Sequence, residues 1–150
     1  MACNLIMNSQ WCPGSTGGPQ YFSGTGPVTY DQFFVSGNRT CSVTMTENNS
    51  TASDSYDLAI PVFGQKSLVF GYIIRAISCN CCYLQVEYYN QNNQPIDILK
   101  MDITRSITAD FRSQMRCFPI PCNAQYAKVS LHFNNQVTAC TFCAPCAYFR

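Results

Sequence analysis

Alternation of apolar and polar side chains between residues 61 and 96 constrains the fold of this chain more than any other feature. In residues 66–77, one face collects the apolar side chains of Leu68, Phe70, Tyr72, Ile74 and Ala76. In residues 83–89, one face holds Leu84, Val86 and Tyr88, and the other holds Tyr83, Gln85, Glu87 and Tyr89. A period of two residues is typical of β-strands with one buried face. The two segments predict a β-hairpin with the sequence SCNCC (78–82) at its turn.

Other segments with strand-like patterning are 30–35, 39–47, 95–104, 126–133 and 140–150, and 56–62 leads into the predicted hairpin. Residues 47–55 are expected to form a turn or loop, and 103–115 a strand and a loop. Two prolines in 113–125 predict a strand that is short or lies at a sheet edge. Strands at this spacing without a helix predict an all-β fold, an antiparallel β-sandwich with jelly-roll topology. Residues 1–150 are expected to form a single domain, with 1–27 as an N-terminal strand plus an arm used in assembly.

Composition limits the classes of partner. Charged residues make up 11% of the chain, against about 25% in an average soluble domain. The net charge is +1 and no run of Lys or Arg occurs, so no nucleic-acid partner is expected. No apolar run is long enough to span a membrane. A surface with few charges resists self-association weakly, which favours assembly.

The chain contains 11 cysteines, an odd number, so at least one thiol is free or bonded to a neighbouring subunit. The N-terminal sequence lacks the basic and apolar regions of a secretory signal. Either the cysteines stay reduced or bind metal in a cytosol, or the protein reaches the exterior without a classical signal peptide. A spore surface layer, released when the mother cell lyses, fits the second route. The cysteines expected to cross-link within or between subunits are Cys3, Cys12, Cys79, Cys81, Cys82, Cys117, Cys122, Cys140, Cys143 and Cys146.

Neighbouring cysteines in SCNCC are expected to have different roles. Alternation carried back from Leu84 points Cys82 inward and Cys81 outward, so the two are poorly placed to bond each other. Cys81 is therefore the candidate for an outward bond. Cys3 and Cys12, near the N-terminus, suit bonds to another subunit.

A metal site is the weaker alternative. Cys140, Cys143 and Cys146 have the spacing C-x-x-C-x-x-C, and structural zinc needs four ligands in a tetrahedron. On an extended strand Cys143 would face away from the other two, unless Pro145 bends the chain. No cofactor is predicted.

No enzymatic activity is predicted. The one histidine, His132, lies on an outward strand face beside Lys128 and Ser130, and no catalytic motif accompanies it. Two pairs of nearby carboxylates are ordinary features of loops: Asp54 with Asp57, and Asp97 with Asp102. Tyr83, Tyr89 and Tyr126 are predicted on outward faces, where such rings either stack on sugars or cover a subunit interface.

Several segments together resemble a known family. They are NLIMNSQW near the start, then GQKSLVFGYIIRA, LQVEYYNQNNQPI and NAQYAKVSLHFNN, followed by a closing hydrophobic strand. This series is similar to jelly-roll domains of the carbohydrate-binding-module type, including those in surface proteins of spore-forming Firmicutes. The resemblance covers nearly the whole chain and rests on turn and core positions. It implies a jelly-roll fold and, as an alternative function, sugar binding.

These features predict a non-enzymatic structural protein that assembles with itself into a cysteine-stabilised fibre, appendage or lattice. Its expected place is a bacterial spore or cell surface. The expected partners are further copies of the chain, other surface-layer proteins and glycans. The alternative is a carbohydrate-binding module, and a third reading is a zinc-stabilised intracellular protein.

Overall fold

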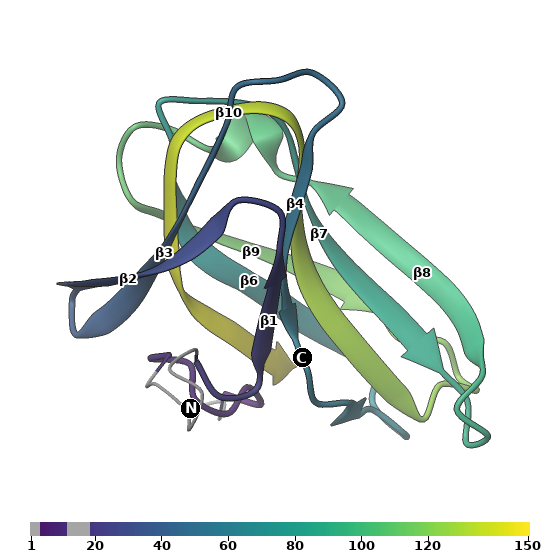
Figure 1. The fold of residues 1–150 in the computed structure, drawn as a ribbon. Coiled ribbons are helices and arrows are strands. Elements are labelled where there is room, and N and C mark those ends of the chain that lie inside the picture. The colour runs from purple at the N-terminus through teal and green to yellow at the C-terminus, as the bar shows by residue number, and fades with distance from the viewer. Residues whose placement is uncertain (1–3, 12–18) are drawn as a thin grey trace.

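The longest strand, β10 (Tyr126–Phe149), runs through both layers of the structure and organises it. The computed structural model describes residues 4–11 and 19–150. In Figure 1, β10 rises in one layer, bends over the top and descends in the other. The bend coincides with two register irregularities, one between Asn134 and Val137 and one between Val137 and Cys140. Positive φ angles at Asn135 (66°) and Ala139 (49°) turn the backbone there.

Consecutive strands follow β10 from one layer into the other. Along one edge of β10 lie β6 (Ser67–Arg75) and then β7 (Ser78–Tyr89), and along its other edge lie β3 (Asn38–Met45) and then β4 (Thr51–Tyr56). The outer strands are β9 (Arg112–Pro119) beside β6, β8 (Pro95–Asp102) beside β7, β2 (Val28–Val35) beside β3, and β1 (Phe22–Thr25) beside β4. The short β5 (Ile60–Pro61) pairs with the start of β10.

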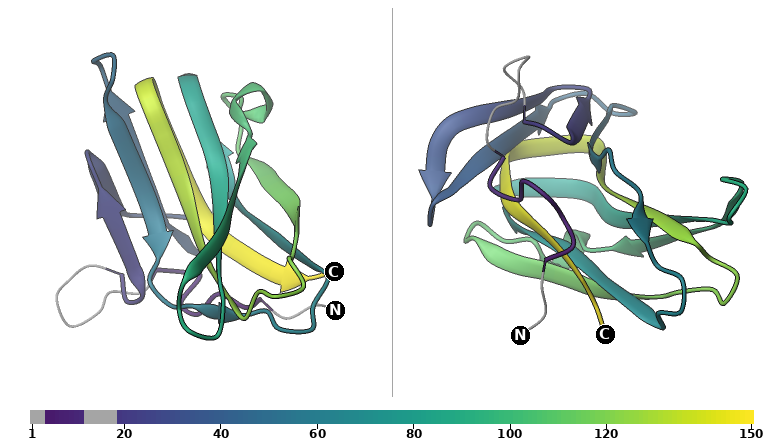
Figure 2. Two further views of the ribbon diagram at one scale, coloured as in Figure 1. Left: turned by 90° about the vertical axis from the view of Figure 1, so that its right-hand side faces the viewer. Right: turned by 90° about the horizontal axis from the view of Figure 1, so that it is seen from below.

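The fold is therefore an all-β, antiparallel sandwich with jelly-roll topology, as predicted. We call its two layers the β7 layer (β8-β7-β10-β4-β1) and the β6 layer (β9-β6-β10-β3-β2). Figure 2 shows the two layers from two further directions. Within the described residues, no helix has the length and apolarity needed to cross a membrane.

The predicted buried faces are confirmed. All five apolar side chains assigned to one face of residues 66–77 are buried, and so are Leu84, Val86 and Tyr88 of β7. They pack with the inward residues of β10, which are Ala127, Val129, Leu131 and Phe133. The edge position predicted for the proline-containing strand is also confirmed, since β6 is the one described strand that pairs with β9.

The predicted hairpin is wrong. β6 and β7 do not pair with each other; both pair with β10, one in each layer. SCNCC is not a hairpin turn but the beginning of β7, just after the chain has passed between the layers at Ala76 and Ile77. Alternation specifies which face of a strand is buried, and that condition is met equally well when both strands pair with a third.

Two other assignments also need correction. Residues 47–55, expected to be a turn or loop, include most of β4. Ala52, Asp54 and Tyr56 of that strand face the core, and the carboxylate among these inward residues disguises the alternation. Residues 126–133 and 140–150, expected to be separate strands, belong to one strand. The ambiguous segment 103–115 contains a short 3-10 turn, η1 (Thr104–Ser106), before β9 begins.

The N-terminal residues close the sandwich near the end of β10. The Leu5 N–H donates to the Ala147 carbonyl oxygen at 2.7 Å, and the Asn4 side chain accepts from the Ala147 N–H at 3.0 Å. Trp11 is fully buried against four rings, those of Phe22, Tyr30, Tyr72 and Phe142. Residues 4–11 thus pack on their own chain. The use of the N-terminal segment as an assembly arm stays a prediction.

Candidate functional site

The outward face of the β7 layer collects polar and aromatic side chains. On β7 these are Tyr83, Gln85, Glu87 and Tyr89, and on β10 they are Tyr126, Lys128, Ser130 and His132. Each set alternates with buried apolar residues, so the pattern that builds the core also turns these groups outward, and among them only Ser130 is buried. The structure brings all three predicted tyrosines to this one face. The left view of Figure 2 looks toward this layer.

One end of the face is fixed by stacking. The rings of Tyr83 and His132 lie parallel, with centroids 4.9 Å apart and planes 5° from parallel. The Lys100 ammonium lies 5.3 Å from the Tyr83 ring centroid. His132 Nε2 and Ser130 Oγ are 2.8 Å apart, within hydrogen-bond distance. Burial, and then the positive charge of Lys100, lower the pKa of His132, so its ring is neutral near pH 7.

The other end of the face is more open. Tyr89 and Tyr126 are directly opposite in the register of β7 and β10, and Tyr126 is also opposite Pro61 of β5. The Tyr126 side chain is 39% exposed. Lys128 holds its ammonium 5.5 Å from the Tyr89 ring centroid and is paired in register with Glu87. Two aromatic rings with a carboxylate and an ammonium beside them match a ligand that has both apolar surface and hydroxyl groups.

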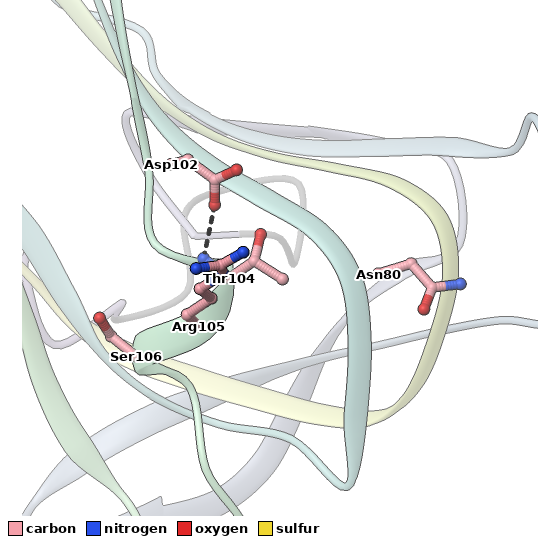
Figure 3. Close-up of a pocket in the computed structure, with 5 residues that line it drawn as sticks. All are labelled: Asn80, Asp102, Thr104, Arg105 and Ser106. Carbon is pink, nitrogen blue, oxygen red and sulfur yellow. Dashed lines mark hydrogen bonds between the residues drawn. The ribbon is translucent and has the colours of Figure 1, made fainter.

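A polar pocket of about 430 Å³ adjoins the stacked end of this face. It is lined by Asn80 at the start of β7 and by Asp102, Thr104, Arg105 and Ser106, where β8 passes into η1. Figure 3 shows the Asp102 carboxylate turned toward the Thr104 N–H, which donates to it at 2.8 Å. Hydrogen bonds from Thr104, aided by the charge of Arg105, lower the pKa of Asp102. The pocket continues the face because Asp102 is paired in register with Tyr83.

This pocket was missed in the sequence. Asp102 lies in the predicted strand 95–104 and is the last residue of β8, but the sequence gives its carboxylate no role beyond a pair with Asp97. The signal available was the position of Asp102 two residues before Thr104, since an aspartate often accepts a hydrogen bond from the backbone two residues further on. Nothing in the sequence placed Asn80 opposite that turn.

A second, more apolar groove of about 380 Å³ lies on the outside of the β6 layer. Its lining includes Ile73, Met115, Cys146 and Tyr148, together with Asn4 from the N-terminal residues. Two tyrosines line this groove, Tyr148 and the buried Tyr72, against three on the outward face of the β7 layer. The two surfaces are on opposite sides of the sandwich, so their contributions to binding can be tested separately.

The described cysteines occupy three kinds of position, and no disulfide joins them. Cys41, Cys82, Cys140 and Cys143 are buried; Cys79, Cys81 and Cys146 are half-buried; Cys117 and Cys122 are exposed. The inward position of Cys82 agrees with the prediction, and Cys81 is more accessible than Cys82. Cys3 and Cys12 lie outside the described residues, so their predicted bonds to other subunits remain predictions.

The three cysteines proposed as a weak metal alternative do not form a site. Ala144 adopts a positive φ of 53°, and the register of β10 with β6 shifts between Cys143 and Cys146. Cys146 lines the apolar groove, whereas the thiol of Cys140 lies close enough to Cys79 to feel its charge. Over residues 4–11 and 19–150, no group of three or more His, Cys, Asp or Glu side chains is arranged to hold a metal ion.

Asp54 is a further departure from the sequence-based interpretation. The sequence predicts an ordinary loop carboxylate at this position, but the side chain is fully buried in β4. The hydroxyl groups of Tyr30 and Tyr72, both from the β6 layer, donate hydrogen bonds to its two oxygens. The carboxylate therefore joins the two layers inside the core and is closed to any ligand.

No protein-family model matches the sequence, and no curated protein matches it. Solved structures of similar shape include a family 16 carbohydrate-binding module, with a TM-score of 0.64 at 16% identity over 96% of this chain and 99% of that one. Another is TmCBM61 in complex with β-1,4-galactotriose, with a TM-score of 0.61 at 9% identity over 99% of this chain and 100% of that one.

Larger proteins contain the same fold. The enzymatically active domain of bacteriophage CBA120 tailspike protein 4 gives a TM-score of 0.72 at 11% identity, over 98% of this chain. The chain spans 21% of that tailspike chain and 27% of an arabinose-bound α-L-arabinofuranosidase. At these identities the likeness establishes the fold, a jelly-roll β-sandwich shared with carbohydrate-binding modules.

Proposed function

We propose that this chain is a non-enzymatic carbohydrate-binding module that holds a sugar chain on the outward face of the β7 layer. The observation that carries the proposal is the juxtaposition of Tyr89 and Tyr126 beside the charged groups of Glu87 and Lys128. A sugar ring has an apolar face of C–H groups and a rim of hydroxyl groups. Tyrosine rings match the face, and the charged side chains match the rim.

The fold supports this proposal over the predicted fibre, because several solved structures that share it are carbohydrate-binding modules. The stacked pair of Tyr83 and His132 would contribute rigidity more than a stacking surface, since one face of the Tyr83 ring is already covered. We therefore place the ligand at the open end of the face, across Tyr89, Tyr126 and Pro61. An extracellular or cell-surface location belongs to the same proposal.

The test compares matched tyrosine variants. Binding to insoluble polysaccharides and to a glycan array would be measured for the wild type and for Tyr89→Ala, Tyr126→Ala and Tyr148→Ala. An aromatic contact contributes about 0.5–1.5 kcal/mol, so each of the first two variants is expected to bind roughly 2- to 10-fold more weakly. Tyr148→Ala, in the groove on the opposite side, is expected to bind normally.

Two outcomes would contradict the proposal in different ways. Loss of binding in Tyr148→Ala alone would move the site to the groove on the β6 layer. A wild-type chain that retains none of the polysaccharides and none of the arrayed glycans would reject sugar binding itself.

A second candidate function is the predicted cysteine-linked assembly, on a bacterial spore or cell surface. The observation that favours it is the exposure of Cys117 on β9, a strand that pairs only with β6, and of Cys122 shortly after it. A strand at a sheet edge offers unpaired backbone groups to a neighbour, and exposed thiols could then lock the contact. Electrophoresis with and without reductant, and electron microscopy without reductant, would test it. A chain that remains monomeric in all three experiments, and whose Cys117→Ser Cys122→Ser variant behaves identically, would exclude this function.

A further inference from the structure

Phe63 lies just after β5, next to the residues on which the proposed ligand rests. At the end of β5, Ile60 and Val62 are buried, whereas Pro61 and Phe63 are exposed. This alternation turns Phe63 to the same face as Pro61, which is paired in register with Tyr126. Phe63 is therefore the diagonal neighbour of Tyr126, and such neighbours are separated by roughly 7–8 Å.

Backbone hydrogen bonds tie this segment to the two tyrosine-bearing strands. The Val62 N–H donates to the Gln125 carbonyl oxygen at 2.9 Å, and the Gln125 N–H donates to the Tyr89 carbonyl oxygen at 2.8 Å. These bonds continue the pairing of β5, β10 and β7 past the residues that are paired in register. The residue before Phe63 is thus fixed to the same part of the sheet as Tyr89.

A tight turn then presents the Phe63 side chain. The Gln65 N–H donates to the Val62 carbonyl oxygen at 3.1 Å, which closes a turn of four residues. Gly64 has a φ of 80°, the conformation that a type II turn requires at its third residue and that glycine adopts without strain. Phe63 is the second residue of this turn, so the backbone holds it in place although its side chain is not packed in the core.

Exposure at Phe63 is large for an aromatic residue. Its side chain is 68% exposed, and that of its neighbour Tyr126 is 39% exposed. With Pro61 between them, they form a continuous apolar patch at the open end of the face. Single exposed apolar residues are common, but a continuous patch beside polar groups is typical of a ligand site.

We propose that Phe63 is a further stacking residue, through which the site favours chains of several sugar rings over single sugars and disaccharides. The inference rests on the proposed function and names the class of ligand, an extended oligosaccharide bound along its length. A disaccharide covers Tyr89 and Tyr126, whereas a longer chain that continues in the same direction also reaches Phe63. Each additional ring that lies on an aromatic side chain adds apolar contact.

The path in the other direction, along the strands toward the polar pocket, offers less for stacking. Between Tyr89 and Tyr83, the outward side chains of β7 are Glu87 and Gln85. The Tyr83 ring is already covered on one face by His132. Aromatic surface therefore favours the path from the two tyrosines to Phe63.

The test measures how affinity depends on ligand length. Calorimetric titration would use cello-, xylo- and manno-oligosaccharides, each from the disaccharide to the hexasaccharide. The affinity of the wild type is expected to rise with length. Phe63→Ala should match the wild type on the disaccharide and bind the longest oligosaccharides roughly 2- to 10-fold more weakly.

Two further variants separate stacking from general surface effects. Phe63→Tyr keeps the aromatic ring and should restore the dependence on length. Phe34→Ala is the matched control, since Phe34 is exposed to a similar degree, 65%, but lies on β2 in the β6 layer. It should behave like the wild type at every length.

The outcomes distinguish this inference from the proposed function. A Phe63→Ala chain that matches the wild type at every length, or that loses as much on the disaccharide, would overturn the inference alone. Weaker binding of long chains in Asn80→Ala but not in Phe63→Ala would place the chain along the strands and also overturn it. A wild type that binds arrayed glycans but gains no affinity with length would do the same, and one that binds no glycan would reject both.

Discussion

Asp54 shows at the scale of one residue how this core tolerates a carboxyl group. The side chain is fully buried, and two tyrosine hydroxyls donate hydrogen bonds to it. Burial raises its pKa from 3.8 to about 6, although the hydrogen bonds from Tyr30 and Tyr72 act in the opposite direction. Because the raised pKa lies above that of the unfolded chain, the folded state holds the extra proton between these values. The contribution of Asp54 to stability is therefore complete below pH 3.8 and is lost as the pH rises through about 6.

The first prediction is that Asp54→Asn flattens this pH dependence. The difference between the two pKa values is equivalent to roughly 3 kcal/mol in the free energy of unfolding. The variant should match the wild type near pH 4 and be more stable near pH 8, because the amide stays neutral. Urea unfolding at several pH values would measure it.

A companion variant tests the direction in which Asp54 changes stability with pH. Tyr72→Phe removes a donor that favours the ionised carboxylate, so it should steepen the fall in stability with pH. If Asp54→Asn keeps the full pH slope of the wild type, Asp54 is not the titrating group.

Single residues also explain why part of the sequence-based interpretation failed. In β6, apolar residues such as Leu68, Phe70 and Tyr72 recur at every second position, and this alternation predicted a buried face. In β4 the inward positions are Ala52, Asp54 and Tyr56, and a carboxylate in the middle of the set hides the pattern. The two hydroxyls that donate to Asp54 belong to Tyr30 and Tyr72. No local sequence pattern connects these tyrosines with Asp54.

At the scale of the element, β10 determines which strands pair, and the alternation of side chains could not predict that pairing. The inward and outward faces of β6 and β7 were predictable, and so was the outward position of Tyr83, Tyr89 and Tyr126. The pairing of strands was not predictable, because β10 continues through its bend and serves both layers. Its bend rests on local irregularities such as the positive φ at Ala139, which alanine does not signal in a sequence. The outward face of the β7 layer was therefore predictable, whereas the pocket beside it depends on that bend.

The second prediction concerns the contact between β6 and β9. A Cβ atom added at Gly71 of β6 would overlap the backbone carbonyl oxygen of Gln114 in β9. Gly71→Ala should therefore push β9 outward and cost roughly 2–3 kcal/mol of stability, as overpacking does elsewhere. The matched control is Gly24→Ala in β1, where the nearest atom is a side-chain methyl of Val28 at 3.1 Å and no backbone atom is closer than 3.6 Å.

Denaturant unfolding of both glycine variants would give the two free energies. Hydrogen exchange would show whether the loss is confined to β9. Equal, small effects in the two variants would mean that β9 can shift without cost.

At the scale of the whole molecule, the two layers meet around residues far apart in the sequence. Trp11 comes from the N-terminal residues, yet it packs on Phe22 of β1, Tyr30 of β2 and Phe142 of β10. It also lies 6.4 Å, centroid to centroid, from Tyr72 of β6. A single side chain thus contacts strands of both layers. Residues 4–11 help to complete the core, and the assembly arm expected within residues 1–27 stays a prediction.

The third prediction follows from this position. Trp11→Ala should destabilise the fold by roughly 3–5 kcal/mol, as removal of large buried side chains usually does. Trp11→Phe should cost much less, because it keeps an aromatic ring and removes an indole N–H that has no hydrogen-bond partner among the described residues. Met7→Ala is the control, since that side chain belongs to the same segment but is 54% exposed. Circular dichroism during urea unfolding suits all three variants. A Trp11→Ala chain as stable as Met7→Ala would show that the N-terminal residues only cover the sandwich, and that the two layers hold together without them.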